Sequence, residues 1–269
     1  MRFGVTIPVS RALIPVAQSW QYQIYHCNSR LDFATARALG DPAGQDPASR
    51  YLGTRGFRQF GPAAAVPLLP PIPSRVALQK VMLQRRSNRS FGGRVTLEEL
   101  STVLEQALGC TSVIEDEGAG LAHALRAWPS AGGLYPIDCY VLAARVDGLA
   151  ADVYHYNPIL QQLEPLGEPT VETVVETAFF GQDITAAAAA ALIFVANFDR
   201  TTSKYGERGY RLVLLDSGHA AQNVLLVTEQ LGLSATAIGG FNDEALSESL
   251  QIDGVDEAPV HAVIIGRPA

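Results

Sequence analysis

The feature that most constrains the fold is a long segment with helical periodicity, residues 207–231. Apolar residues occupy two adjacent stripes of this helix: Leu212, Leu215, Leu226, Val213, Val224, Val227 and Leu231. A helix that is apolar around most of its circumference is normally buried inside a protein. Gly232 follows the segment and is a typical helix end. The sequence therefore predicts a central, mostly buried helix.

A buried sheet is the expected partner of that helix. Residues 190–198 form an uninterrupted apolar run of strand length, which indicates a strand that is covered on both faces. Further strands are predicted at 137–146, 151–158 and 258–268, and further helices at 74–87, 96–109 and 170–181. In 96–109, Thr96 and Glu99 form a capping box and Gly109 ends the helix. Helices interleaved with few strands indicate an α+β domain.

The N-terminal part is less regular. Residues 1 to about 60 have weak periodicity, and 61–73 contain five prolines. Proline fixes φ and removes a backbone donor, so 61–73 is predicted to be an extended strap that lies on a protein surface, of this chain or of another subunit. We divide the chain into an irregular extension, 1–74, and a folded domain, 75–269.

Composition excludes several classes of function. The net charge of −7 argues against non-specific binding to nucleic acid. Cys27, Cys110 and Cys139 are far apart and lack metal-ligand spacing, so neither a disulfide frame nor a zinc site is expected. The two later cysteines are predicted to be small buried residues. No run approaches the ~20 apolar residues of a membrane span, and the N-terminus makes a poor signal peptide. A cytoplasmic protein is expected.

Five stretches could carry chemistry. "QRRSNRSF" places Arg85, Arg86, Ser87 and Arg89 at a predicted helix end, where they could bind a phosphate or form a solvated basic turn. "IGRP" offers Arg267 as one more phosphate contact or as a surface arginine.

"WPSAGGLYP" joins a loop to a strand. Pro129 stiffens the loop, Ser130 adds a hydroxyl, and Ala131, Gly132 and Gly133 allow backbone N–H groups to approach a ligand. A tight turn would explain the same residues.

Two short segments complete the set. Gly239 and Gly240 in "AIGGFND" raise the same choice between N–H donors and a simple turn. In "SKYGERGYR", Lys204 and Tyr205 could be surface residues or an acid/base pair.

The order of these motifs is more specific than any one of them. "RRSNR", "PSAGGLYP", "KYGERGYR", "SGHAAQNVLLVTEQLGL" and "GGF" follow one another over residues 75–268. This arrangement resembles the FMN-dependent nitroreductase superfamily, and within it the SagB-type azoline dehydrogenases. "YHCNSRLDF" is similar to a segment upstream in SagB-type chains.

The resemblance implies a nitroreductase-like fold, with a central mixed β-sheet surrounded by helices, in an intertwined homodimer with FMN at the subunit interface. By analogy, residues 85–89 would hold the phosphate and the ribityl and pyrimidine side, with Arg267 as a further phosphate contact. The 129–133 loop would pack on the isoalloxazine, usually from the partner chain. Gly239 and Gly240 would direct N–H groups toward flavin N5. His219, Gln222 and Asn223 of the helix motif are expected to be buried hydrogen-bonding residues.

The resemblance also implies a role for Lys204 and Tyr205. Oxidation of a thiazoline or oxazoline to its azole removes a hydride, which FMN accepts, and a proton, which this pair would take. The expected function is thus azoline oxidation in a peptide natural product, with the substrate delivered by a cyclodehydratase or a peptide-synthetase carrier domain. The alternatives are an NAD(P)H-dependent nitro- or quinone reductase and a non-catalytic flavoprotein scaffold.

Overall fold

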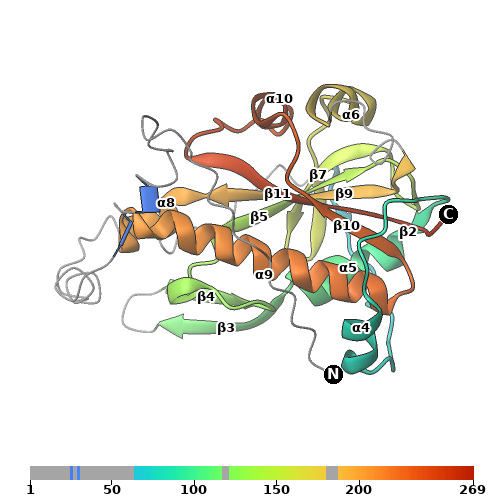
Figure 1. The fold of residues 1–269 in the computed structure, drawn as a ribbon, viewed down its shortest axis with the longest axis horizontal. Coiled ribbons are helices and arrows are strands. Elements are labelled where there is room, and N and C mark those ends of the chain that lie inside the picture. Colours follow the sequence, from blue (N-terminus) through green and yellow to red (C-terminus); the bar gives the residue numbers. More distant parts are fainter. Residues whose placement is uncertain (1–24, 27–28, 31–63, 117–120, 180–186) are drawn as a thin grey trace, which may run out of the picture.

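The fold is a central antiparallel sheet between two layers of helices (Figure 1). The computed structural model describes residues 25–26, 29–30, 64–116, 121–179 and 187–269. Most of the predicted extension 1–74, including Cys27, lies outside these residues, and its boundary stays a prediction.

Seven strands form the central sheet in the order β1-β8-β7-β5-β9-β11-β10. Their bounds are β1 Val66–Pro67, β5 Ile137–Ala143, β7 Asp152–Asn157, β8 Gln162–Pro165, β9 Ala190–Asn197, β10 Ser234–Ile238 and β11 Glu257–Gly266. Each neighbouring pair is antiparallel. The expectation of a mixed sheet is therefore wrong for the described strands. No two neighbouring strands of this sheet are parallel, so none of these pairs needs the crossover helix that parallel neighbours require. In the chain β9 is followed by β10 and then β11, and in the sheet β11 lies between β9 and β10.

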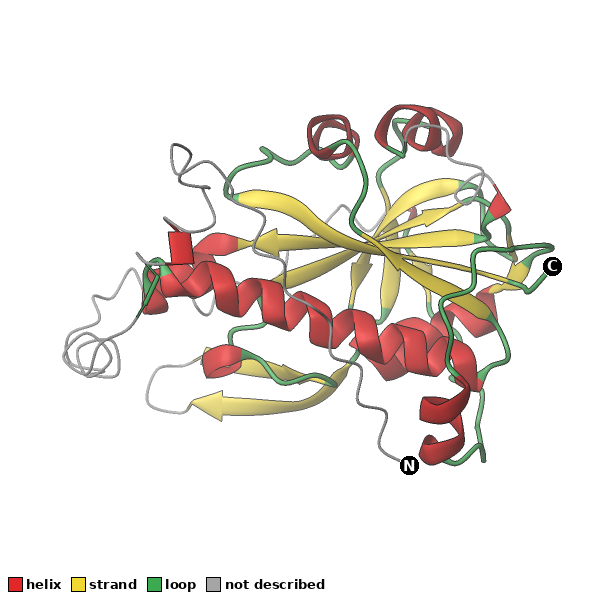
Figure 2. Cartoon of the chain, viewed as in Figure 1, coloured by secondary structure: helices red, strands yellow, loops and turns green. Residues whose placement is uncertain are grey.

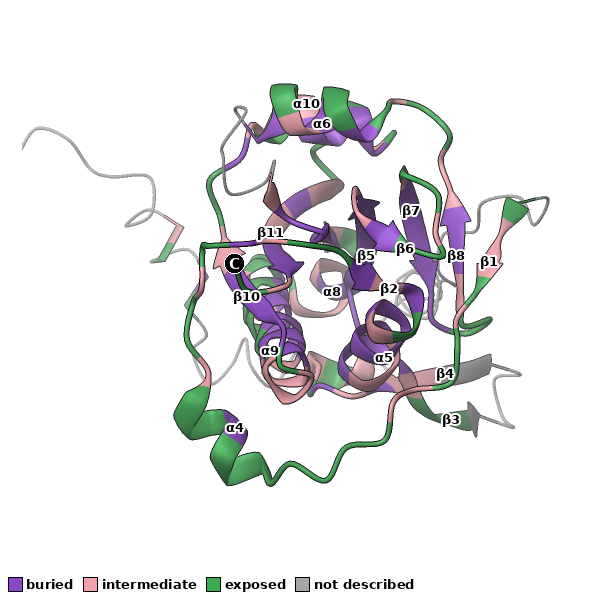
Figure 3. Ribbon diagram, turned by 90° about the vertical axis from the view of Figure 1, so that its right-hand side faces the viewer, coloured by how far each residue is buried: buried purple, intermediate pink, exposed green. Residues whose placement is uncertain are grey.

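Helices cover both faces of the sheet (Figures 1 and 3). The layer with α5 (Leu97–Leu108) and α9 (Arg208–Gln230) lies on one side, and α6 (Val171–Ala178) and α10 (Asp243–Ser249) lie on the other. Strand β9 contributes Leu192 and Phe194 to the first core and Ile193 and Val195 to the second. This alternation confirms that residues 190–198 are covered on both faces.

The strap lies on its own chain. β1 pairs with β8 at the sheet edge. Beyond it, Leu69 N donates to Ser101 Oγ (3.0 Å) and Ile72 N donates to Thr102 Oγ1 (2.9 Å), both on α5. The predicted capping box of α5 is confirmed, since Thr96 accepts from Glu99 N and Glu99 accepts from Thr96 N. The strap is thus an extended segment, as predicted. Two of its backbone N–H groups donate to side chains of α5, whereas in a helix they would donate to carbonyls of the same helix.

Two small sheets and one short helix lie outside the central sheet (Figures 2 and 3). A hairpin of β3 (Cys110–Asp116) and β4 (Leu121–Arg126) and a short pair of β2 (Val95–Thr96) and β6 (Val146–Asp147) form two small sheets. Helix α4 (Leu78–Gln84) is shorter than the predicted 74–87 helix, and only Val81 of it is buried. The hairpin was not anticipated, because the strand pattern of 110–126 is irregular.

Helix α9 has the predicted bounds but not the predicted burial. Val213, Ala220 and Val224 are fully buried, whereas Leu214 and Leu215 are 41% and 58% exposed. His219 and Gln222 are also exposed, so the expectation that they are buried is wrong. One long side of α9 therefore faces away from the core of its own chain.

Two smaller expectations have mixed outcomes. Cys139 is buried, as predicted, but Cys110 is only half-buried. In the part of the chain that the structure describes, no helix is long and apolar enough to cross a membrane.

Candidate functional site

The predicted glycine loop folds around Ser130. Ser130 Oγ accepts a hydrogen bond from Tyr135 N (2.9 Å), and Gly133 N donates to Ser130 O (3.1 Å). Gly132 and Gly133 have φ values of 66° and 68°, in the left-handed region that glycine adopts without a steric cost. A Cβ on Gly133 would meet no atom within 4 Å, so that side of the loop is open.

Lys204 and Tyr205 lie directly against this loop. They end helix α8 (Phe198–Tyr205), which Gly206 terminates with φ 54°. A Cβ added to Gly132 would lie 2.8 Å from Tyr205 Oη and 3.0 Å from Lys204 Nζ. Lys204 Nζ is 5.4 Å from the centroid of the Tyr205 ring. Two motifs that are 70 residues apart in the sequence are thus brought together, in one chain.

A buried arginine connects helix α8 to the loop. Arg200 is 3% exposed, donates to Tyr135 O (3.2 Å) and lies 3.7 Å from Asp138 Oδ1. Arg200 therefore links the end of the loop and the start of β5 to the helix that carries Lys204 and Tyr205.

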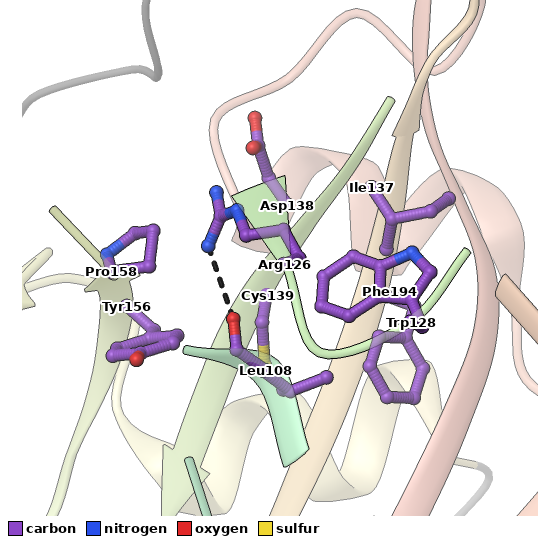
Figure 4. A pocket seen from close by; sticks show the side chains of 9 residues that line it. All are labelled: Leu108, Arg126, Trp128, Ile137, Asp138, Cys139, Tyr156, Pro158 and Phe194. Atoms are coloured by element: carbon purple, nitrogen blue, oxygen red, sulfur yellow. Dashed lines mark hydrogen bonds between the residues drawn. The ribbon is translucent and has the colours of Figure 1, made fainter. Parts of the chain in front are cut away.

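A small cavity is lined by Trp128 and Ile137, which flank the loop in sequence (Figure 4). The cavity has a volume of about 10 Å³, room for roughly one water molecule. Trp128 packs edge-on to Tyr135, at 5.6 Å between ring centroids, and the Arg126 guanidinium lies 5.8 Å from the Trp128 ring. Arg126 also donates to Leu108 O (3.1 Å), and burial lowers its pKa. The cavity is too small to hold a substrate.

Asp216 holds the loop from the other side. This residue of α9 is 3% exposed and accepts hydrogen bonds from Ser130 Oγ and from the backbone N–H of Ala131. Burial raises the pKa of Asp216 from 3.8 to about 6, although both hydrogen bonds and the nearby His219 favour the charged form.

The arginine segment lies at the start of β10. Ser87 forms a bridge with Ala235, and Asn88 N donates to Ala235 O (3.0 Å). Arg86 donates to the carbonyls of Leu83 and Arg85.

Within the described part of the chain, no hydrogen bond or ion pair engages the guanidiniums of Arg85 and Arg89. Arg89 is exposed and Arg85 is half-buried. These two side chains fit a phosphate best.

Gly239 and Gly240 lie at the opposite end of β10. Both are exposed, and a Cβ on either would meet nothing within 4 Å. β10 has five residues, or about 16 Å at the usual rise of a strand. The arginine segment and the two glycines therefore lie at opposite ends of one short strand.

Arg267 lies close by but has a different partner. Its guanidinium donates to both carboxylate oxygens of Glu99 (2.7 and 2.9 Å) and to Arg94 O (3.1 Å). To contact a phosphate, Arg267 would have to share or leave this bidentate pair. Its predicted role is the least supported by the geometry.

The predicted site is divided between the two ends of α9 (Figure 1). Lys204 and Tyr205 precede its first residue, and Ser234, which hydrogen-bonds to Asn88, follows its last. At 1.5 Å per residue, the 23 residues of α9 span about 34 Å. The predicted site residues of one chain therefore form two groups, or half-sites: the arginine segment at β10, which we call the phosphate half after its predicted role, and the Lys–Tyr half, which is the loop with Lys204 and Tyr205 at α8.

Sequence reasoning missed the residues that support the site. Arg200 and Asp216 lie beside quoted motifs. The signal that could have identified Asp216 is a charged residue in a helix that is otherwise largely apolar. Arg200 lies in the polar segment "DRTTSKY", which gives no such signal. Asn223 is only half-buried, but it forms hydrogen bonds as expected: its Nδ2 donates to Ala107 O (3.4 Å) and Ala127 O (3.1 Å).

The nitroreductase family model matches residues 82–267, well over half of the chain. The chain belongs to the nitroreductase family. It is therefore a nitroreductase-family oxidoreductase, and the superfamily that the order of the motifs suggested is confirmed.

Three similarities define its position within the family. The chain is 36% identical over 200 residues to protein MJ1384 of Methanocaldococcus jannaschii, which is named as a nitroreductase; the match covers 74% of this chain and 94% of MJ1384. It is 30% identical over 146 residues to the microcin B17-processing protein McbC of Escherichia coli, over 52% of this chain and 54% of McbC. The third is a chain in the structure of the E. coli microcin synthetase McbBCD complex with truncated pro-MccB17 bound.

That chain shares the fold, with a TM-score of 0.59 and 21% identity over 94% of this chain and 99% of its own length. The match to McbC extends the resemblance to a protein that is named for processing microcin B17.

Proposed function

We propose that this protein oxidises thiazoline or oxazoline rings of a peptide natural product to the corresponding azoles, with FMN as cofactor. The observation that carries the proposal is the position of Lys204 and Tyr205 against the Gly132 turn. A reductase that transfers only a hydride from a nicotinamide has no need of a phenol and an ammonium at this place. The similarity to McbC, a protein that processes microcin B17, supports a peptide substrate.

The described residues fit FMN in two halves. Arg85 and Arg89, with Ser87 between them, would hold the single phosphate, since guanidiniums form bidentate contacts with phosphate oxygens. Gly239 and Gly240 would place backbone N–H groups beside the ring system, and the open face of the 129–133 loop would cover it. When bound, FMN supplies a two-electron acceptor for the hydride that leaves the azoline ring.

The chain's own residues would remove the proton. Tyr205 Oη would take the proton from the α-carbon of the azoline, and the ammonium of Lys204 would stabilise the negative charge of the phenolate that does so. Loss of one hydride and one proton converts the ring to the azole. The Gly132 turn keeps both side chains at the loop surface, because no side chain at position 132 occupies that space.

A second copy of the chain would complete each site. The half-sites at the two ends of α9 are too far apart for one FMN to contact both. Two antiparallel copies of α9 would bring the phosphate half of one chain to the Lys–Tyr half of the other. Exposed apolar side chains line α9 and the neighbouring α4, where a partner could cover them: Tyr210, Leu214, Leu215, Leu78, Met82 and Leu83. Patches of this kind are typical of interfaces.

The substrate would be delivered by another protein. The related fold in the McbBCD complex favours a cyclodehydratase, and a peptide-synthetase carrier domain is the other option. We expect the enzyme to work in the cytoplasm.

A nitro- or quinone reductase is the second candidate, because the protein of higher identity, MJ1384, is named as a nitroreductase. Steady oxidation of NADPH with a nitroarene or quinone, combined with no reaction toward azoline peptides, would favour it. A scaffold that retains flavin only for structure would show neither activity.

The decisive experiment is anaerobic single-turnover bleaching of bound FMN by a thiazoline peptide. We expect Tyr205→Phe to slow bleaching by about 10²–10⁴-fold, the usual effect of losing a general base, with flavin content unchanged. Lys204→Ala should also slow it. Tyr154→Phe is the matched control, since Tyr154 lies on β7 and its hydroxyl donates to Ala150 O (2.9 Å) outside the contact with Gly132. Bleaching of the Tyr205 and Lys204 variants at the wild-type rate would remove the pair from the mechanism.

Cofactor identity is tested separately. Mass spectrometry of the extracted flavin should show FMN and no FAD. Arg89→Ala should weaken FMN binding by about 1.5–3 kcal/mol, as expected for a charged hydrogen bond. Arg94→Ala is the control, because Arg94 pairs with Asp147.

A further inference from the structure

Asp216 is a buried ionisable residue for which the proposed mechanism has no direct use. It lies on α9, whose buried positions around it are apolar or small, and it is 3% exposed. A buried carboxylate is costly unless its oxygens accept hydrogen bonds. Its two donors, Ser130 Oγ and Ala131 N, both come from the glycine loop. The carboxylate thus faces the loop.

These two hydrogen bonds fix the part of the loop that reaches Lys204 and Tyr205. Ser130 Oγ donates to Asp216 and accepts from Tyr135 N, so one hydroxyl connects the helix to both ends of the turn. Gly132 follows Ala131 directly, and its backbone is the surface on which Lys204 Nζ and Tyr205 Oη lie.

We propose that Asp216 is a positioning residue: its carboxylate anchors the Ser130–Ala131 turn, and the turn in turn sets the position of Lys204 and Tyr205. The catalytic consequence rests on the proposed function; the anchoring does not. Hydrogen bonds to an ionised acceptor are roughly twice as strong as those to a neutral one, so the charged form is the one that holds the turn.

The surroundings of Asp216 make this anchor sensitive to pH. The loop presents only the neutral hydroxyl and amide to it, and on its own helix His219, one turn away, acts on it electrostatically. With a pKa of about 6, the carboxylate is ionised at neutral pH and loses its charge just below.

Amide hydrogen exchange tests the anchor without any substrate. At neutral pH, Asp216→Asn should accelerate exchange of the amides of residues 130–135 by at least about tenfold relative to the wild type. Ser130→Ala removes the same contact from the loop side and should have a similar effect, and it decides the matter if the Asp216 variant does not fold. Ser217→Ala is the matched control: Ser217 is buried next to Asp216, and its hydroxyl has no hydrogen-bond partner among the described residues.

The second measurement is the pH profile of single-turnover flavin bleaching. The wild-type rate should fall below about pH 6, whereas Asp216→Asn should be about 10–100-fold slower at pH 7.5 and lack that acidic limb. Unchanged exchange at 130–135 in both loop-contact variants would overturn the proposal, and so would an equal loss of rate in Ser217→Ala. If the wild type fails to oxidise azolines while exchange responds as expected, the proposed function is wrong and the anchor stands.

Discussion

Division of the site between two chains can be tested by mixing two inactive variants. One chain carries Arg85→Ala with Arg89→Ala and so lacks the phosphate half. The other carries Tyr205→Phe and lacks the general base. Each homodimer should be inactive. Because each site takes one half from each chain, a heterodimer has one site with both defects and one site with none. We therefore expect about half of the wild-type turnover per dimer.

The reasoning depends on the length of α9, about 34 Å for 23 residues, between the two halves. The assay uses co-expression with two different affinity tags, tandem purification of the heterodimer, and azoline oxidation per dimer. The control places all three substitutions in one chain and pairs it with the wild type. That heterodimer should be inactive if the sites are shared, since each site then has one defect. An active control and an inactive test heterodimer would show that each chain holds its own complete site.

Three further predictions rest on the contacts and burial of single residues. Gly132→Ala should slow flavin bleaching at least about tenfold, because its Cβ would meet Tyr205 Oη at 2.8 Å. Gly133→Ala is the control, since it shares the ~1–2 kcal/mol of left-handed backbone strain but not this contact. Equal bleaching rates in the two variants would contradict the prediction. Leu215→Glu should yield monomers without FMN in analytical ultracentrifugation, whereas Leu160→Glu, at the same 58% exposure, should remain dimeric; a dimeric Leu215 variant would exclude this face. For Asp216, the folded pKa of about 6 lies above the ordinary 3.8, because burial disfavours the charge more than the hydrogen bonds from the loop favour it. The ionised carboxylate therefore holds the loop but lowers the free energy of unfolding of the whole protein: the contribution of Asp216 to global stability is complete below pH 4 and is lost as the pH rises through 6. The difference in free energy of unfolding between wild type and Asp216→Asn should fall by about 2–3 kcal/mol between pH 4 and 7 in urea titrations; parallel pH profiles would refute the shift.

Local chemistry explains which elements were predictable. The capping box of Thr96 and Glu99, the end of α9 before Gly232 and the apolar run of β9 each depend on a few adjacent residues. Strand direction does not, because it depends on how distant segments pair, and the sheet proved antiparallel rather than mixed. The hairpin of residues 110–126 was missed for a similar reason. Its register shifts between Cys110 and Ser112, which breaks the two-residue period.

The candidate site shows the same limit. The residue types of the loop, the arginine segment and the Lys–Tyr pair were evident in the sequence. The contact between Gly132 and Tyr205 was not, since it arises from tertiary packing of α8 against a loop 70 residues earlier. Arg267 illustrates the converse, because a motif suggested a phosphate contact and the fold supplies Glu99 as its partner.

The wrong expectation about α9 carries information of its own. The sequence makes this helix apolar around most of its circumference, yet the fold of one chain covers only one side, with Val213 and Val224 inside and Leu215 outside. Exposed leucines on a long helix are a liability for a monomer, so we expect contacts from outside the described residues to cover them. The separation of the half-sites at the two ends of the same helix requires an outside contribution as well. One second copy packed along α9 would satisfy both requirements, since it would cover the leucines and bring a Lys–Tyr half to each phosphate half.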